Sequence, residues 1–237
     1  MDENVTALAA LLRERQPCVV LTGAGISTES GIPDFRSPTG IWAQYDPMEY
    51  ATIEAFRRDP RKVWSFYKPR LAMLTEAEPN PSHVALAELE RLGLVEAVVT
   101  QNIDLLHERA GSREVIEVHG SIRTAECLAC GATTPLDASM PRCPACGSLM
   151  KPGVVMFGEL LPVAPMERAV ELAQAAGLLL VIGSTLEVYP VAGLPQETLS
   201  SGGALAIVNR GATPYDPVAD VRVDAGAGET LSRLLRA

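Results

Sequence analysis

The stretch CVVLTGAGIS at residues 18–27 is an apolar strand that runs directly into a glycine turn. An open parallel sheet begins in this way, because the turn leads the chain into a helix that packs on the strand. Gly23 and Gly25 let the backbone approach a pyrophosphate, and the next helix N-terminus favours an anion. The dinucleotide fingerprint has a third glycine where this chain has Thr28, so a purely structural tight turn is the alternative.

The same order, an apolar strand followed by a polar loop, repeats along the chain. We expect strands at 95–100, 115–118, 178–182, 204–208 and 221–224, and helices at 4–15, 82–92, 166–176 and 229–236. Residues 35–80 break the pattern with prolines and most of the aromatic residues, and an irregular, partly helical excursion is expected there. The pattern predicts an α/β fold with a Rossmann-like parallel sheet and helices on both faces.

Ligands of open parallel sheets bind outside the carboxyl ends of the strands. Five polar loops would fall at such ends: 22–36, 100–104, 119–120, 183–187 and 209–211.

Composition limits the functional classes. The 237 residues, 47% of them apolar, suffice for one large domain with a smaller one attached. A net charge of −9 opposes binding to a phosphate backbone, so nucleic acid is not expected as the main ligand. The sequence shows neither a signal peptide nor a membrane span, which favours a cytoplasmic protein, with a monomer as the working expectation.

Four cysteines form two Cys-x-x-Cys pairs with twelve residues between the pairs: Cys127, Cys130, Cys143 and Cys146. In a cytoplasmic protein such pairs indicate a metal site before a disulfide. Four thiolates make a closed, structural site for one Zn²⁺, since no ligand position stays open for a substrate. The fifth cysteine, Cys18, lies in the first strand and is expected to be buried packing.

Two of the polar loops hold candidate reactive groups. His119 follows an expected strand and is suited to act as a base near neutral pH. Residues 100–104 read TQNID, whose amide and carboxylate groups could hold a ligand amide; helix capping by Asn102 or Asp104 is the alternative. The other two histidines are expected to pack or cap: His83 and His107.

Taken in order, these segments resemble the sirtuins, the NAD-dependent protein-lysine deacylases. The resemblance runs from about Val19 to Leu234 and is carried by GAGIS (23–27), GIPDFR (31–36), TQNID (100–104), HG (119–120), the cysteine pairs, VVMFGE (154–159), GSTL (183–186) and IVN (207–209). It implies a Rossmann-type NAD-binding domain made of residues 1–36, 79–120 and 154–237. A small domain would combine a helical excursion (37–78) with the zinc module (121–153).

The resemblance also assigns residues to the two substrates. NAD would contact Gly23, Ala24, Gly25, Thr28, Phe35, Arg36, Gln101, Asn102, Ile103, Asp104, Gly183, Ser184, Thr185, Asn209 and Ala225. The acylated-lysine protein or peptide would contact Val155 and Phe157, and the extended segment 153–157 would add the peptide as a strand.

The implied reaction transfers the acyl group of a protein lysine to ADP-ribose. The acyl oxygen attacks the ribose C1′ as nicotinamide leaves, and His119 then acts as general base on a ribose hydroxyl that attacks the acyl carbon. The products are free lysine, nicotinamide and O-acyl-ADP-ribose.

One sirtuin branch removes succinyl, malonyl and glutaryl groups, and binds the acyl carboxylate with a Y-x-x-R pair. Tyr67 and Arg70 match this pair, and a phenol with a guanidinium suits a carboxylate. Pro69 disfavours helix at Lys68, which counts against a shared helical face; a core tyrosine and a surface arginine are the alternative. We expect deacetylation together with some removal of acidic acyl groups.

Other functions are open to the same sequence. Mono-ADP-ribosyl transfer to a protein side chain would not need a base placed for the ribose hydroxyl, and a non-catalytic NAD or ADP-ribose sensor would not need His119 or Asp104. A nucleic-acid zinc ribbon is disfavoured, because residues 121–153 hold no aromatic residue and only three basic ones: Arg123, Arg142 and Lys151.

Overall fold

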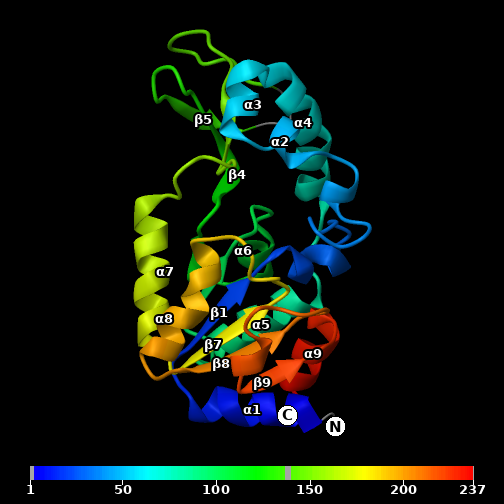
Figure 1. Ribbon diagram of the computed structural model, residues 1–237, viewed down its shortest axis with the longest axis vertical. Helices are drawn as coiled ribbons and strands as arrows, with labels where there is room; N and C mark the ends of the chain where they lie inside the picture. Colours follow the sequence, from blue (N-terminus) through cyan, green and yellow to red (C-terminus); the bar gives the residue numbers. More distant parts are fainter. Residues whose placement is uncertain (1–2, 137–139, 237) are drawn as a thin grey trace.

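The computed structural model describes residues 3–136 and 140–236, and a parallel six-stranded sheet in the order β3-β2-β1-β7-β8-β9 forms its base (Figure 1). The strands are β1 (Cys18–Thr22), β2 (Ala97–Thr100), β3 (Val115–Glu117), β7 (Leu178–Ile182), β8 (Ala204–Val208) and β9 (Val221–Val223). Val20 of β1 pairs with Val98 on one side and Leu180 on the other. The chain therefore winds outward from β1 in both directions, and β1 and β7 flank the switch point where such sheets bind ligands.

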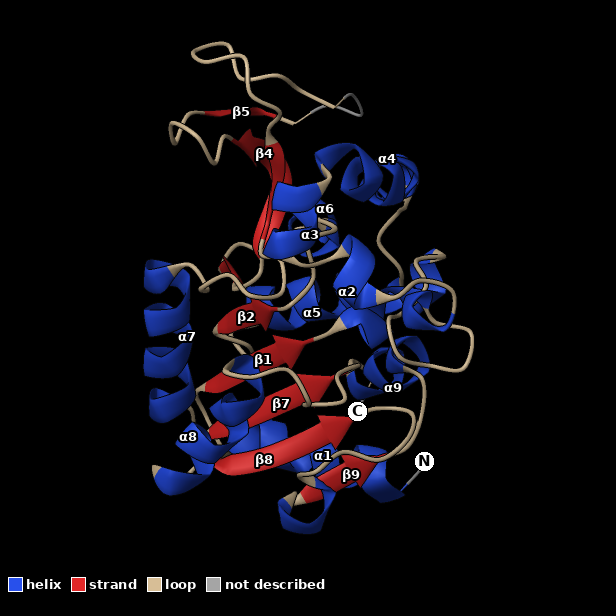
Figure 2. Ribbon diagram, turned by 45° about the horizontal axis from the view of Figure 1, so that its top comes forward, coloured by secondary structure: helices blue, strands red, loops and turns tan. Residues whose placement is uncertain are grey.

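Helices cover both faces of this sheet (Figure 2). Side chains alternate along β1, so that Cys18 and Val20 pack in one apolar cluster and Val19 and Leu21 in the other. The first cluster lies under α1 (Glu3–Glu14), α5 (Pro81–Arg91) and α9 (Ala227–Leu234), and the second under α7 (Val163–Ala175) and α8 (Leu194–Ser200). The predicted fold class is confirmed. Burial raises the pKa of the Cys18 thiol well above its ordinary value, as the predicted packing role requires.

The upper part of the molecule in Figure 1 joins two segments that are distant in sequence. One holds α2 (Pro47–Tyr50), α3 (Ile53–Arg58) and α4 (Pro60–Glu76); the other holds β4 (Gly120–Glu126), β5 (Thr133–Pro135) and β6 (Lys151–Val154) as an antiparallel sheet in the order β5-β4-β6. Trp64 of α4 donates from Nε1 to the carbonyl of Met150 over 2.8 Å. The two segments thus pack as a unit. The domain boundaries stay a prediction, and residues 137–139 of the expected zinc module lie outside the described residues.

The excursion at 35–80 is more regular than expected. Side chains of Asp46, Thr52 and Asp59 accept hydrogen bonds from backbone N–H groups at the starts of α2, α3 and α4. Two of the prolines that suggested irregularity stand at first helical positions, where a missing N–H is harmless: Pro47 of α2 and Pro60 of α4.

Pro69 lies inside α4 without ending it. The prediction that it would interrupt the helix at Lys68 is wrong, because α4 is held by packing of Phe66, Tyr67 and Leu71 in an apolar cluster. Tyr67 and Arg70 consequently lie one turn apart on a continuous helix. The chain also contains α6 (Leu106–Ala110). None of the helices within residues 3–136 and 140–236 is both long enough and apolar enough to cross a bilayer.

Candidate active site and metal centre

The glycine turn after β1 packs directly on the loop after β7. Gly25 N donates to Gly183 O over 2.8 Å, and Gly23 N donates to Ile182 O over 3.1 Å. A Cβ at either Gly23 or Gly25 would lie 2.8 Å from the Gly183 carbonyl oxygen, and Gly183 itself has a left-handed φ of +61°. Loop packing therefore already requires glycine here, and it places the turn at the switch point of the sheet, so the structural and nucleotide-binding interpretations are compatible.

The loop after β2 is fastened to this turn by buried polar groups. Ser27 Oγ donates to Asp104 Oδ2 (2.7 Å), and Leu106 N donates to Asp104 Oδ1 (3.0 Å). Asn102 Nδ2 donates to Gly23 O (3.1 Å) and to Ser27 Oγ (3.2 Å). Burial raises the pKa of Asp104, and its hydrogen bonds from Leu106 and Ser27 oppose this shift. Asp104 thus accepts from the first N–H of α6, although the N-cap position of this helix is Leu105, and it also orders the glycine turn.

His119 follows β3 at the same end of the sheet. Its Nδ1 lies 3.1 Å from the carbonyl oxygen of Gln101. A carbonyl can only accept, so Nδ1 carries the hydrogen and the basic lone pair is on Nε2. Nε2 has no partner among the described residues and is not sealed from solvent. Burial lowers the pKa of His119, and the bond to Gln101 opposes this, so the ring is a neutral base at pH 7.

The remaining loops join the same edge. Gln101 Nε2 donates to Ser184 Oγ over 3.0 Å, and Arg36 Nε pairs with Glu187 Oε2 at 3.3 Å. Asn209 N donates to Val223 O (3.1 Å), which brings the ends of β8 and β9 together, and Ala225 lies two residues further along the chain.

Others of the predicted NAD residues lie on these same loops: Ala24, Thr28, Phe35, Ile103 and Thr185. Their contacts with NAD stay a prediction.

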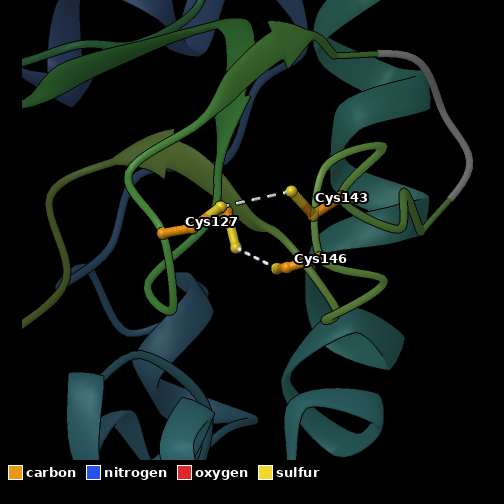
Figure 3. Close-up of side chains that lie close together, drawn as sticks. Cys127, Cys143 and Cys146 are labelled. Carbon is orange, nitrogen blue, oxygen red and sulfur yellow. Dashed lines mark hydrogen bonds between the residues drawn. The ribbon is translucent and has the colours of Figure 1, made fainter.

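The four cysteines converge in the small domain. Their sulfur atoms all lie within 4.8 Å of one another, with 3.5 Å between Cys127 and Cys146 and between Cys130 and Cys143 (Figure 3). A tetrahedral ion with Zn–S bonds of ~2.3 Å holds its ligands roughly 3.8 Å apart, so the donor set fits one zinc ion.

Each Cys-x-x-Cys pair is folded in the same way. Gly131 N donates to Cys127 O, and Gly147 N donates to Cys143 O, both over 2.8 Å. Each glycine has a left-handed φ, +74° and +76°. The glycine after each pair is a signal of this turn that the cysteine spacing alone did not use.

The predicted acyl-binding pair lies in the wall of the small domain. Tyr67 is buried, and the guanidinium of Arg70 stacks 3.6 Å from the Phe66 ring centre and 4.5 Å from that of Tyr45. Among the described residues no carboxylate pairs with Arg70, and its Nε is buried without a partner. Burial lowers the pKa of Arg70 and raises that of Tyr67 above its ordinary value. Tyr67 is a core residue, as the alternative to an acyl-binding role predicted. Arg70 is half-buried, whereas that alternative predicted a surface arginine.

Both edges of segment 153–157 are already occupied. On one edge Val155 N donates to His119 O (2.8 Å) and Phe157 N donates to Ala51 O (2.9 Å). On the other edge, Val154 O accepts from Lys151 Nζ, and Met156 N donates to Glu159 Oε2. These contacts restrict where a peptide strand could join the segment, and strand addition at 153–157 stays a prediction. Among the described residues, Gly158 is the next whose backbone N–H and C=O have no partner.

Comparisons with known proteins decide the family. The sequence profile of the Sir2 family matches residues 23–190, more than half of the chain. The chain belongs to the Sir2 family. A relative from Pyrobaculum aerophilum, NAD-dependent protein deacylase 2, is 48% identical over 96% of this chain and 93% of its own length.

Two solved Sir2 structures cover 98% of this chain and 97% of their own, at 41% identity. One, a complex with a deacetylated p53 peptide and 3′-O-acetyl ADP ribose, has a TM-score of 0.93; the other, with a p53 peptide and NAD⁺, has a TM-score of 0.89. The predicted family is confirmed. In this Sir2 protein, three residues to which the sequence assigned no role in the site contact Asp104 or the segment 153–157: Ser27, Lys151 and Glu159.

Proposed function

We propose that this Sir2 protein removes acyl groups from lysine side chains of proteins in a reaction that consumes NAD. The observation that carries the proposal is His119, whose Nε2 is left as a free, neutral base at the edge of the sheet where the glycine turn and the TQNID loop meet. The names of relatives, NAD-dependent protein deacylase and deacetylase, support the same activity.

The residues divide the work as follows. NAD supplies the ribose carbon that accepts the acyl oxygen when nicotinamide leaves. The turn that Gly23 and Gly25 allow to pack on the Gly183 loop would face the phosphates, and the Asn102–Ser27–Asp104 network holds the loop that would bind the nicotinamide carboxamide. His119 Nε2 takes a proton from a ribose hydroxyl, which becomes the nucleophile toward the acyl carbon; the bond from that carbon to the lysine nitrogen then breaks, and one water molecule is consumed. Its Nδ1–H, held by Gln101 O, keeps the ring in the required tautomer.

The zinc ion would act on folding and not on the reaction. Four cysteine ligands leave no open position for water or substrate. We propose that the helical excursion (37–78) and the zinc module (121–153) form one small domain over the sheet. We also propose that the protein is a cytoplasmic monomer. Its five cysteines form no disulfide bond, which supports a reducing compartment.

We further propose that Arg70 and Tyr67 receive the carboxylate of succinyl and malonyl groups. A half-buried guanidinium that has no acid partner among the described residues is costly, and an acyl carboxylate would supply the missing opposite charge. Val154 and Met156 pack in the same cluster as Tyr67, next to Val155.

The experiment is mass spectrometry of one peptide carrying acetyl-, malonyl- or succinyl-lysine, incubated with the protein with and without NAD. NAD-dependent loss of the acyl group is expected. Arg70→Met should lower turnover of the succinyl peptide by roughly tenfold or more while sparing the acetyl peptide, since a charge-assisted bond contributes about 1.5–3 kcal/mol. Equal losses on both peptides would contradict the carboxylate role, and no loss of any acyl group by the wild type would contradict the function.

A further inference from the structure

Lys151, at the start of β6, is a charged side chain that is only 1% exposed. Its Nζ lies 2.7 Å from Glu126 Oε1 and 3.1 Å from Glu159 Oε2. It also donates to Val154 O over 2.6 Å and to Pro152 O over 3.1 Å. A buried ammonium is tolerated only when it is paired and its protons are all bonded, and these four acceptors meet that condition.

The acceptors form a pattern along the chain. In an extended segment the backbone groups of alternate residues point to one edge. Pro152 O and Val154 O bind Lys151, while Met156 N donates over 2.8 Å to Glu159 Oε2, which itself pairs with Lys151. One ion pair thus occupies the edge of 152–156 on which a neighbouring strand would otherwise pair.

The opposite edge of the segment leads to the reaction centre. Val155 N donates to the carbonyl of His119 over 2.8 Å, so the segment and the base are held in fixed relation. Lys151, Val155 and Gly158 all line one cavity of about 560 Å³, which also reaches Glu159 and Leu160. Gly158, with its unpartnered backbone groups, comes after the edge that Lys151 closes.

We propose that Lys151 is a positioning residue for the acylated peptide. Together with Glu159, it occupies the edge of 152–156 that carries Pro152 O, Val154 O and Met156 N. An incoming peptide can therefore pair only from Gly158 onward, and its acyl-lysine is presented toward His119 in one register. The inference rests on the proposed deacylase function and adds a residue that touches neither NAD nor the acyl group.

The test compares Lys151→Met with Lys151→Arg in the full-length, zinc-loaded protein. Steady-state rates with an acetyl-lysine peptide and NAD give separate KM values for each substrate, and calorimetry gives NAD binding. Lys151→Met should raise the peptide KM by about tenfold or more and leave the NAD affinity unchanged, because only peptide placement is lost. Lys151→Arg should restore most of the peptide affinity, since a guanidinium can serve two carboxylates and a carbonyl.

Lys62→Met is the matched control. It makes the same substitution in the same domain and breaks the ion pair with Glu49, but it does not contact 152–156. It should leave the peptide KM as in the wild type. If Lys151→Met does not fold, Glu159→Gln replaces it; the amide can still accept from Met156 N but no longer carries the charge, and a smaller rise in peptide KM alone is expected.

An unchanged peptide KM in these variants would overturn the inference, as would a parallel loss of peptide affinity, NAD affinity and zinc, which marks a merely structural role. Both results leave the proposed function standing, because that function is tested separately by whether the wild type removes the acyl group from any acylated peptide when NAD is present.

Discussion

At the scale of single residues, His119 shows what sequence can and cannot give. Its position after a strand and before Gly120, as one of only three histidines, pointed to a base. The sequence could not show that Nδ1 is bound by a backbone carbonyl 3.1 Å away, because that contact joins loops eighteen residues apart. Lys151 was counted only as a basic residue, although burial makes it part of the site.

His119→Asn should retain the fold and NAD binding but lower acyl removal by about 10²–10⁴-fold, the usual contribution of a general base. The amide of asparagine can still donate to Gln101 O but cannot take a proton. Rates measured by mass spectrometry, with NAD binding measured by calorimetry, check the prediction. Retained acyl removal would take His119 out of the mechanism.

The wild-type pH profile gives a second test of the same residue. Burial lowers the pKa of His119 below its ordinary value of 6.5, so the ring is already neutral above that pH. Around neutral pH the protonation state of His119 should not change, so we expect no effect of this residue on the pH dependence of kcat/KM there. As the pH drops below 6.5 and the ring gains a proton, kcat/KM should fall. An acid limb well above 6.5 would contradict this assignment.

At the scale of elements, the strands of the parallel sheet could be predicted from the sequence, whereas the helices of the excursion could not. The buried strands β1, β7 and β8 were predicted within a residue, because continuous apolar runs bounded by glycine leave little choice. The helices α2–α4 were underestimated, since prolines at helix starts look like breakers until the caps are known. Helix α8 was not predicted at all, and the helix signal there is hidden by Pro195 in its first turn.

Gly25→Ala should weaken NAD binding and destabilise the protein. The new Cβ would meet the backbone of Gly183 at 2.8 Å, and backbone on both sides cannot move aside cheaply. Gly193→Ala is the control, because its Cβ would meet nothing closer than 4.0 Å and its φ is negative. NAD binding measured by calorimetry and the melting temperature distinguish the two variants. If both variants bound NAD and melted alike, the contact between Gly25 and Gly183 would be unimportant.

Cys127→Ser should release zinc and lower the melting temperature of the small domain, because a structural zinc site contributes folding free energy. Metal analysis and thermal melting give the readout. Cys18→Ala removes the one thiol outside the cluster and should keep the metal. If Cys127→Ser kept a full equivalent of zinc, the four-thiolate assignment would be wrong.

At the scale of the whole molecule, the sheet places five loops at one edge and a second unit above them. Topology could be anticipated, since alternating strands and helices restrict a parallel sheet to few arrangements. The way in which 37–78 meets 121–153 could not, because it depends on contacts such as Trp64 with Met150 across 86 positions. The contacts on the two edges of 153–157 could not be predicted for the same reason, because they depend on how the whole molecule is assembled.

Folding stability of the whole molecule should depend on acid through two buried histidines. Burial lowers the pKa of His83 to about 4 and that of His107 to about 3, so both stay neutral when folded. An unfolded histidine protonates near pH 6.5, so the unfolded state binds more protons below that pH and stability falls with acid. From pH 6.5 down to about 4, His83 alone should remove on the order of 3 kcal/mol.

Urea unfolding across this pH window measures the effect. His83→Gln cannot titrate and should show a shallower loss of unfolding free energy than the wild type over the same window. Identical slopes in the two proteins would show that His83 is not the titrating group.

The most direct test of the proposed deacylation is the fate of the acyl group. One acetyl-lysine peptide, NAD and the protein are followed by mass spectrometry. Proposed acyl transfer predicts one nicotinamide and one O-acetyl-ADP-ribose for each lysine freed, and no change without NAD. Free acetate released without NAD, or ADP-ribose attached to the peptide with its acetyl group still present, would contradict it.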